Sequence, residues 1–153
     1  MARLVKNHRE PGWSSSISGI VDGEGKEHML VEGLFDNGDK YRGQWHHGVF
    51  QGSGVYDWPD KMQYRGDYMD GKRSGMGVHD WPSGVRYEGE WKDDKQNGMG
   101  VRLYADGDTF HGAFRDGNRV YGVYTWVNGH KALIKCDDDD EEIESERITG
   151  MDV

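Results

Sequence analysis

The sequence has little of what stabilises an ordinary globular domain. Apolar residues make up only 34% of the 153 residues and the mean hydropathy is −0.95, so we do not expect a thick two-layer core. The single cysteine, Cys136, excludes an intramolecular disulfide and fits a reducing compartment. No apolar run approaches the roughly 20 residues that span a bilayer, and no apolar core of a secretory signal is present.

Positive charge is also scarce, and its distribution bears on possible partners. From residue 41 to residue 131 the chain carries 12 Lys and Arg against 12 Asp and Glu. Residues 135–153 hold two basic and nine acidic residues, which accounts for −7 of the formal net charge of −9. Nothing resembles a polybasic footprint, so binding to nucleic acid is not expected and net charge does not favour anionic lipid. A local cluster of Lys72 and Arg73 beside Arg65 or Lys95 is the one basic feature that could face a headgroup.

Glycine, in contrast, is abundant, with 24 residues, and aromatic residues recur at a fixed spacing. A unit of the form aromatic-X-Gly-X-aromatic starts at residues 41, 64, 87 and 110, which are 23 residues apart each time. Such self-similarity indicates an array of small units that must stack to bury apolar surface. The leading aromatic pairs are Tyr41 and Trp45, Tyr64 and Tyr68, Tyr87 and Trp91, and Phe110 and Phe114.

Other positions recur in phase with this unit. Counted from the leading aromatic, Gly-X-Gly falls at offsets 11 and 13, valine follows it, and a further aromatic stands at offset 17 in the first three units. The fourth unit keeps this pattern one residue early, and residues 34–40 match residues 103–109 as a half unit. We therefore divide the chain into a leader or degenerate hairpin at 1–30, a repeat array at 31–134 and an acidic tail at 135–153.

Each unit is predicted to be a β-hairpin. Apolar and polar residues alternate over offsets zero to four, which is the period of a strand and not of a helix. Glycine would destabilise helix interiors but supplies the positive φ of hairpin turns, and between two aromatics it lets a ring from the adjoining strand lie across the backbone. We expect the return strand at offsets 13–17, with its valine on the opposite face from the rings.

The repeated Tyr-X-Gly-X-Trp-X-X-Gly-X-X-X-Gly-X-Gly pattern resembles the MORN repeat (membrane occupation and recognition nexus), a 23-residue module. The resemblance covers about two thirds of the chain. It implies an all-β fold, a single-layer curved antiparallel sheet of tandem hairpins. It also implies a scaffold or binding module, and because the array and its flanks fill the sequence, no accompanying enzyme domain is expected.

Catalysis, cofactors and metals are not expected. Asp57 and Asp80 stand at the same offset of successive units, and Asp106 and Asp108 share a turn. Residues that recur because their unit recurs are better explained by sheet and turn requirements than by one reaction centre. The histidines lack a metal-ligand spacing and are predicted to be solvated; they are His46, His47, His79 and His111.

The aromatic residues carry the functional hypothesis. The leading pairs are predicted to form a structural ladder, and a second row of side chains is predicted to bind a partner, because Trp, Tyr and Arg concentrate binding energy. This second row consists of Tyr56, Trp58, His79, Trp81, Arg102, Tyr104, Tyr124 and Trp126. At about 4.8 Å per strand four hairpins extend roughly 38 Å, enough for a helix of about 25 residues. The expected partner is a protein, such as a helical segment, or a second copy; the alternative is a peripheral membrane adaptor that recognises phospholipid headgroups.

The acidic tail leaves three interpretations open. Its like charges favour a disordered, solubilising segment, whereas Asp137–Asp140 would also suit the start of a short helix that caps the sheet. A calcium loop is disfavoured because consecutive aspartates lack the alternating ligand spacing of an EF-hand. Gly23-Glu24-Gly25 hints at a decayed hairpin in the leader. The expected location is the cytoplasm, with cilium, cytoskeleton and plastid as alternatives.

Overall fold

The fold is known from a computed structural model that describes residues 3–6, 18–21, 29–46 and 49–148. Every described element is a β-strand, so the all-β prediction is confirmed. The strands are β1 (Arg3–Lys6), β2 (Ser18–Val21), β3 (Met29–Leu34), β4 (Lys40–His46), β5 (Val49–Asp57), β6 (Gln63–Met69), β7 (Lys72–Asp80), β8 (Arg86–Lys92), β9 (Lys95–Leu103), β10 (Thr109–Arg115), β11 (Asn118–Thr125), β12 (Lys131–Cys136) and β13 (Glu142–Arg147).

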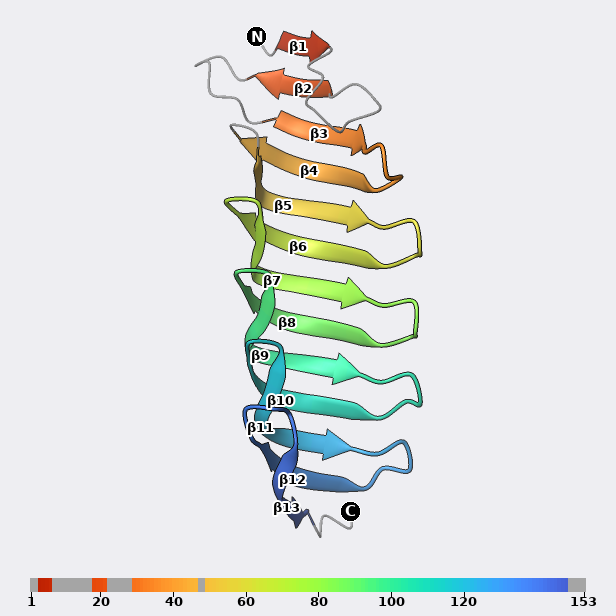
Figure 1. Cartoon of the computed structure of the whole chain (residues 1–153), viewed down its shortest axis with the longest axis vertical. Coiled ribbons are helices and arrows are strands. Elements are labelled where there is room, and N and C mark those ends of the chain that lie inside the picture. The colour runs from red at the N-terminus through yellow and green to blue at the C-terminus, as the bar shows by residue number, and fades with distance from the viewer. Residues whose placement is uncertain (1–2, 7–17, 22–28, 47–48, 149–153) are drawn as a thin grey trace.

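The strands stack in chain order as a ladder (Figure 1). Strands β3 to β13 form one 11-stranded antiparallel sheet in which each strand pairs with its neighbours in sequence, and β1 pairs with β2. Each pairing is therefore local, as expected for a repeat array whose units contact only their neighbours. The tandem hairpins predicted from the 23-residue period are confirmed.

Two kinds of turn alternate along the ladder. Tight turns join the strands of a repeat, and both central residues have positive φ, as at Asp70 (51°) and Gly71 (81°) or Asp93 (48°) and Asp94 (69°). Such turns match the right-handed twist of a hairpin. Wider turns connect successive repeats: in one of them the Trp81 amide donates to the Val85 carbonyl at 2.9 Å.

The return strand is longer than predicted, and it bends. In the second unit it begins immediately after the tight turn, at Lys72 in β7, and not at offset 13. Gly43 pairs with Gly54 but Trp45 pairs with Phe50, so three residues of β5 face one residue of β4. Gly52, inside this bulge, has a φ of 70°. A bulge bends its strand, and here the bend stacks the Phe50 ring on that of Tyr41 with centroids 4.0 Å apart.

The two faces of the sheet differ in character. The inner face carries the leading aromatics, and the outer face carries the recurring valines, as predicted. On the inner face each leading ring lies over glycines: a Cβ added to Gly77 would come 2.6 Å from Cε2 of Tyr64. The predicted close approach of ring and glycine backbone is confirmed.

The sheet continues past residue 134 into a fifth hairpin, β12 and β13, so residues 142–147 form a strand and not the capping helix that was one interpretation of the tail. Ala132 pairs with Tyr124 and Ile134 pairs with Gly122, so Ala132 takes the place of the leading aromatic and Ile134 that of the glycine. Both side chains are buried with Cys136. A small residue in place of the ring leaves room for a larger one in place of the glycine, so the hairpin stacks without the repeat's sequence. Gly23-Glu24-Gly25 lies outside the described residues.

Candidate functional site

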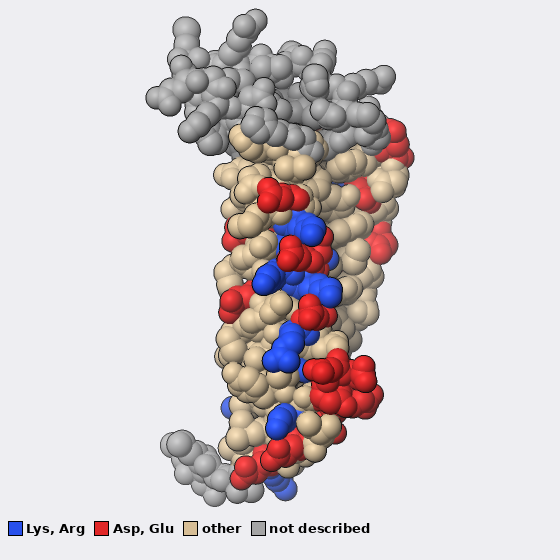
Figure 2. Space-filling view, turned by 60° about the vertical axis from the view of Figure 1, so that its left-hand side comes forward, with Lys and Arg blue, Asp and Glu red and all other residues tan. Residues whose placement is uncertain are grey.

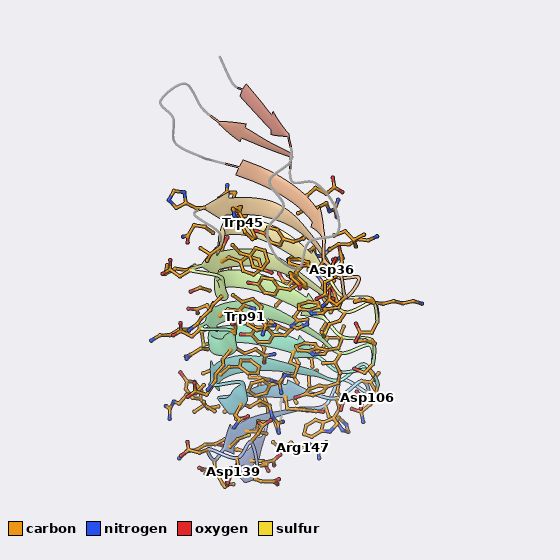
Figure 3. All side chains as sticks on the ribbon, turned by 45° about the horizontal axis from the view of Figure 1, so that its top comes forward. Asp36, Trp45, Trp91, Asp106, Asp139 and Arg147 are labelled. Atoms are coloured by element: carbon orange, nitrogen blue, oxygen red, sulfur yellow. The ribbon has the colours of Figure 1, made fainter. Side chains whose placement is uncertain are left out.

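The aromatic ladder, defined as the eight leading aromatics from Tyr41 to Phe114, is buried throughout and forms the core. Its rings meet edge to face: the Tyr64 and Trp91 centroids lie 5.2 Å apart at 82°. The Tyr87 hydroxyl donates to the Glu90 carbonyl at 2.9 Å, and burial raises the pKa of Tyr87 to about 12. In Figure 3 Trp45 and Trp91 lie one above the other along the stack of strands. The ladder is thus the layer on which the rest of the inner face rests.

The second row lies beside the ladder on the inner face. Five of its rings are partly buried and pack against the core, namely Tyr56, Trp58, Trp81, Tyr104 and Tyr124. Trp126 is exposed, at 39%. The ring contacts run from Tyr56 to Trp58, with centroids 4.5 Å apart, and resume from Tyr104 to Tyr124 at 5.7 Å. The structure therefore brings all eight predicted residues onto one face, where part of each half-buried ring remains accessible.

Two buried aspartates anchor the ends of this row, and sequence reasoning missed their role. The Tyr56 hydroxyl donates to Asp39 at 2.6 Å, and the Tyr124 hydroxyl donates to Asp108 at 2.8 Å. Burial, followed by the hydrogen bond to Asp39, raises the pKa of Tyr56. The match between residues 34–40 and 103–109 already placed the two aspartates at equivalent positions, and that was the available signal.

His79 is buried, so the prediction that it is solvated is wrong. Its ring is sandwiched between Trp58 and Trp81, at centroid distances of 5.5 and 4.0 Å and nearly parallel. Nδ1 lies 3.0 Å from Nη1 of Arg73, and Nε2 has no partner among the described residues. Burial, and then the charge of Arg73, lowers the pKa of His79 to about 4. The residue is therefore a neutral ring in the stack.

Arginine replaces an aromatic ring in the third unit. Arg102 lies over the Phe114 ring at 4.9 Å and donates to Oε1 of Gln96 at 2.6 Å and to the Gly117 carbonyl at 2.8 Å. Arg73 likewise lies 4.5 Å over the Trp91 ring. These cation–π contacts place guanidinium groups among the rings of the inner face. The sequence analysis placed Arg73 in a basic cluster and missed its contact with the rings, because Phe50 occupies the equivalent position in the first unit.

A ladder of ion pairs joins successive tight turns on one side of the molecule, where acidic and basic residues alternate (Figure 2). Its pairs connect residues 21 positions apart: Lys72 with Asp93 at 3.6 Å, Arg73 with Asp94 at 3.1 Å, Lys95 with Asp116 at 3.3 Å and Arg119 with Asp140 at 2.7 Å. Arg65 pairs with Asp80 at 3.2 Å. The basic cluster considered from the sequence is thus neutralised by neighbouring carboxylates.

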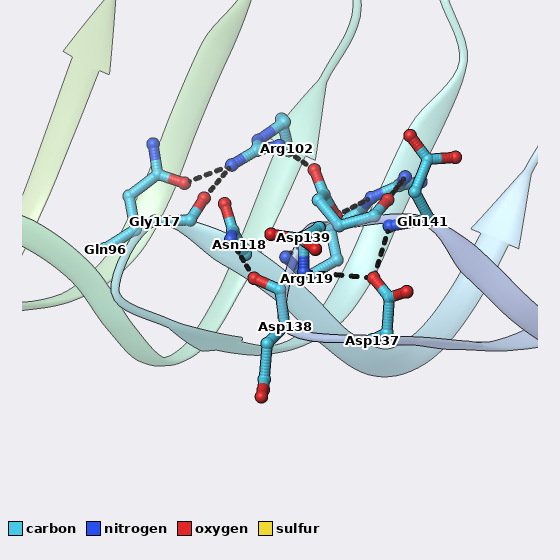
Figure 4. A network of polar contacts seen from close by, with 10 residues as sticks. Gln96, Arg102, Gly117, Asn118, Arg119, Asp137, Asp138, Asp139 and Glu141 are labelled. Carbon is cyan, nitrogen blue, oxygen red and sulfur yellow. Dashed lines mark hydrogen bonds and ion pairs between the residues drawn. The ribbon is translucent and has the colours of Figure 1, made fainter.

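The acidic run, residues 137–142, takes part in the ladder of ion pairs and is not a free tail. In Figure 4 the loop 137–141 closes over Arg102 and Arg119. Asp140, with a φ of 66°, accepts from the Arg119 amide at 3.0 Å, as Asp94 accepts from the Arg73 amide at 2.9 Å. Asp137 to Asp140 therefore form the turn of the fifth hairpin. Burial raises the pKa of the neighbouring Cys136 thiol.

The other aspartates and histidines that the sequence analysis considered either make hydrogen bonds within the sheet or are exposed. Asp80 accepts from Arg86 on the outer face, and Asp57 accepts from the Gln63 amide. His46 and His111 are exposed, and His47 lies outside the described residues. Within the described residues no group of three His, Cys, Asp or Glu side chains has the arrangement of a metal site. No helix in that part of the chain has the length and apolar character needed to cross a bilayer.

The outer face carries a second feature, which the sequence did not predict. A hollow of about 580 Å³ lies over β7 to β10, with Met76, Met99, Val101 and Leu103 among its lining residues. The charged and polar residues Arg86, Glu88 and His111 also line it. This hollow is separated from the second row by the thickness of the sheet.

The geometry defines a tandem β-hairpin repeat protein with one ring-lined face. The family profile described as MORN repeat matches residues 41–63, 64–86, 87–109 and 110–131. The chain belongs to the MORN-repeat family, as the sequence resemblance predicted. Proteins of this family commonly serve as protein-interaction or membrane-binding modules, and the repeat itself is generally noncatalytic.

Two further comparisons add little. No curated protein matches the chain. Among solved structures, one described as the SAS-4 (dCPAP) TCP domain in complex with a proline rich motif of Ana2 (dSTIL) of Drosophila melanogaster is 12% identical, with a TM-score of 0.39. The match covers 96% of this chain and 99% of that one. Likeness at this level carries no inference about function.

Proposed function

We propose that this protein is a noncatalytic scaffold whose second row binds a protein partner, or a second copy of the chain, along the inner face. The observation that carries the proposal is the row itself, because half-buried Trp and Tyr rings on a rigid sheet are the groups in which binding energy concentrates. Their positions are held by the ladder beneath, so little conformational entropy is lost when a partner binds.

The polar groups of the row support the same proposal. The indole N–H of Trp91 in the ladder donates to the Gly77 carbonyl at 3.2 Å. No acceptor within the described residues pairs with the indole N–H of Trp58 or Trp81, and neither is a buried unsatisfied group. These two donors are therefore not fully buried and remain available to carbonyl groups of a partner.

The test compares wild type with a Trp58→Ala/Trp81→Ala variant. Proteins captured by the wild-type chain are identified by mass spectrometry, purified, and titrated against both forms. We expect loss of binding with an unchanged circular dichroism spectrum, because both rings lie outside the ladder. Met69→Gln, an exposed change on the outer face, is the matched control. Undiminished binding by the double variant would show that the second row is not the binding surface.

The membrane alternative receives less support. Lys72, Arg73 and Lys95 each pair with an aspartate, so they present no uncompensated positive patch to anionic headgroups. Flotation with vesicles containing phosphatidylserine separates the two functions. Co-flotation that weakens with added salt would favour the membrane adaptor.

A further inference from the structure

The second row presents one aromatic ring at the start of each wide turn. The amides of Trp58 and Trp81 each donate, at 2.9 Å, to the carbonyl four residues further on, and Tyr104 and Trp126 begin the next two turns in the same way. Equivalent residues of successive units are two strands apart in the sheet, which is about 9.6 Å at about 4.8 Å per strand. The row therefore offers a partner one ring in about every 9.6 Å along the sheet.

A polyproline II helix has nearly the same period. It has three residues per turn and rises about 3.1 Å per residue, so side chains on one side of it recur after about 9.3 Å. Over the three intervals from Trp58 to Trp126 it drifts from the rings by only about 1 Å. An α-helix returns to the same side after seven residues, or about 10.5 Å, and drifts by about 3 Å over that span. The spacing therefore favours a polyproline II ligand over the helical segment expected from the sequence.

The polar groups of the second row suit the same ligand. A polyproline II helix makes no internal hydrogen bonds, so its carbonyls are free to accept, and its prolines have no N–H to donate. The indole N–H groups of Trp58 and Trp81 have no acceptor within the described residues and are not fully buried. A row that offers rings and donors thus complements a chain that offers pyrrolidine rings and acceptors, and grooves lined by aromatic residues bind proline-rich segments in this way.

The wide turns that follow the second row are acidic. They form one long edge of the ladder (Figure 1), and Figure 3 shows Asp36 and Asp106 on this edge. These two aspartates and Asp60 are exposed and make no ion pair within the described residues, and Lys61 is the one Lys or Arg in these turns. The turns are residues 35–39, 58–62, 81–85, 104–108 and 126–130. A ligand beside this edge is therefore favoured by basic side chains.

We propose that the second row binds a proline-rich, basic segment of its protein partner in the polyproline II conformation, with one turn of the ligand to each hairpin. The proposal rests on the proposed function and names the ligand of that same surface. Prolines at every third position pack on the rings from Trp58 to Trp126, and carbonyls between them accept from the indoles. Lys or Arg side chains of the ligand face Asp60 and Asp106. Because the ligand is already extended when free, little entropy is lost on binding.

Isothermal titration calorimetry of the full chain with synthetic peptides tests the ligand class. The probe consists of four Pro-Ala-Lys triplets. A second peptide has the same composition with its prolines at irregular intervals, and a third has glutamate in place of lysine. We expect the regular lysine peptide to bind at least about tenfold more tightly than either of the others. Attraction between lysine and the acidic residues of 135–153 acts equally on the first two peptides, so their comparison isolates the spacing.

Two sets of variants assign the binding to the second row and its edge. Trp58→Ala/Trp81→Ala should abolish binding of the regular peptide, because the packing surfaces and both indole donors are removed. Met69→Gln, at an exposed position of the outer face, is the matched control and should bind as wild type does. Binding that survives the tryptophan changes would overturn the proposal.

The acidic edge has its own test. Asp60→Asn/Asp106→Asn should lower the preference for lysine over glutamate by about threefold. Asparagine keeps the side-chain oxygen that accepts from the amides of Met62 and Asp108, so the turns are preserved. Asp139→Asn, an exposed change in a tight turn at the opposite edge, is the matched control. An equal effect of Asp139→Asn would contradict the placement of the ligand's basic residues beside the wide turns.

The regular and irregular peptides also separate this proposal from the proposed function. Equal binding of the two, or no binding of either, would overturn the polyproline II ligand. If Trp58→Ala/Trp81→Ala abolished binding of the captured partner while the regular peptide bound no better than the irregular one, the proposed function would stand and the ligand class alone would be wrong.

Discussion

The guanidinium of Arg73 donates a hydrogen bond to Nδ1 of His79 across 3.0 Å. Because arginine is always protonated and carries no acceptor, Nδ1 must accept, and the proton of the neutral imidazole lies on Nε2. Nε2 is buried without a partner among the described residues. The ring therefore contributes to the second row as an aromatic surface, and protonating it would place two positive charges side by side.

His79 should make the fold sensitive to acid. The unfolded chain takes up a proton near pH 6.5, whereas the folded chain does so only near pH 4. Between these values the unfolded state binds more protons, so stability is complete above about pH 6.5 and is lost as the pH falls toward 4. We expect this site to contribute roughly 1–3 kcal/mol of that loss.

Urea unfolding at about pH 7 and about pH 5 measures the effect. His79→Phe keeps a ring between Trp58 and Trp81 but cannot titrate, so its stability should fall less between the two conditions. His111→Phe, at an exposed position of the outer face, should behave as wild type. An identical fall in wild type and His79→Phe would rule out His79 as the source.

The contact between Tyr64 and Gly77 predicts non-additive mutations. A methyl group on Gly77 would lie 2.6 Å from Cε2 of Tyr64, so Gly77→Ala should cost about 1–3 kcal/mol. Tyr64→Ala removes a buried ring and should cost about 3–5 kcal/mol. In the double variant the added methyl group meets the space that the ring has left, so the costs should fall short of their sum by roughly 1–3 kcal/mol.

Chemical denaturation of the two single variants and the double variant gives this coupling. Gly77→Ala combined with Phe110→Ala, two units away, is the matched control and should be additive. Additivity in both pairs would mean that the ring and the glycine do not constrain each other.

Much of the fold could be read from the sequence because the repeat makes every contact local. The 23-residue period gave the hairpins, and the alternation around Gly66 gave the buried ladder and the outward-facing valine. The bend at Gly52 could not be read in this way. It depends on a bulge that opposes three residues of one strand to a single residue of the next, and the sequence period is the same with or without it.

The candidate site was also predicted only in part, because some of its contacts depend on features that the repeat period does not specify. Sequence offsets placed His79 in the second row, but its burial depends on Arg73, Trp58 and Trp81, which three different strands and turns bring together. The fifth hairpin was missed because Ala132 and Ile134 replace the ring and glycine that identify a repeat. The alternation of polar and apolar residues in Lys131–Cys136 was present, and it indicated a strand without the repeat pattern.

Asp140 should hold the fifth hairpin onto the array. It accepts from the amide of Arg119 at 3.0 Å and from Nε at 2.7 Å, in a half-buried position where a charge-assisted bond is worth more than at the surface. Asp140→Ala should destabilise β12 and β13 locally by about 1–3 kcal/mol. Hydrogen exchange should then accelerate in residues 131–147 and remain slow in β6 to β9.

Asp139→Ala is the matched control, because the Asp139 side chain is exposed and makes no hydrogen bond or ion pair among the described residues. Its exchange pattern should match that of wild type. Equal acceleration in the two variants would assign the effect to lost negative charge, and not to the contact with Arg119.

The buried tyrosines should make the fold sensitive to alkali. In the unfolded chain a tyrosine loses its proton near pH 10, whereas burial keeps Tyr87 protonated in the folded chain until about pH 12. Between these values the folded state binds more protons, so stability is present below about pH 10 and is lost as the pH rises further.

Tyr87→Phe removes this contribution along with the hydrogen bond to Glu90. The variant should be about 1 kcal/mol less stable at neutral pH and should lose less stability than wild type in alkali. Guanidinium unfolding at both conditions, with tyrosinate absorbance recorded alongside, measures the two effects. Tyr121→Phe, at an exposed position of the outer face, should show neither effect. If Tyr87→Phe were as sensitive to alkali as wild type, the buried hydroxyl would not control the transition.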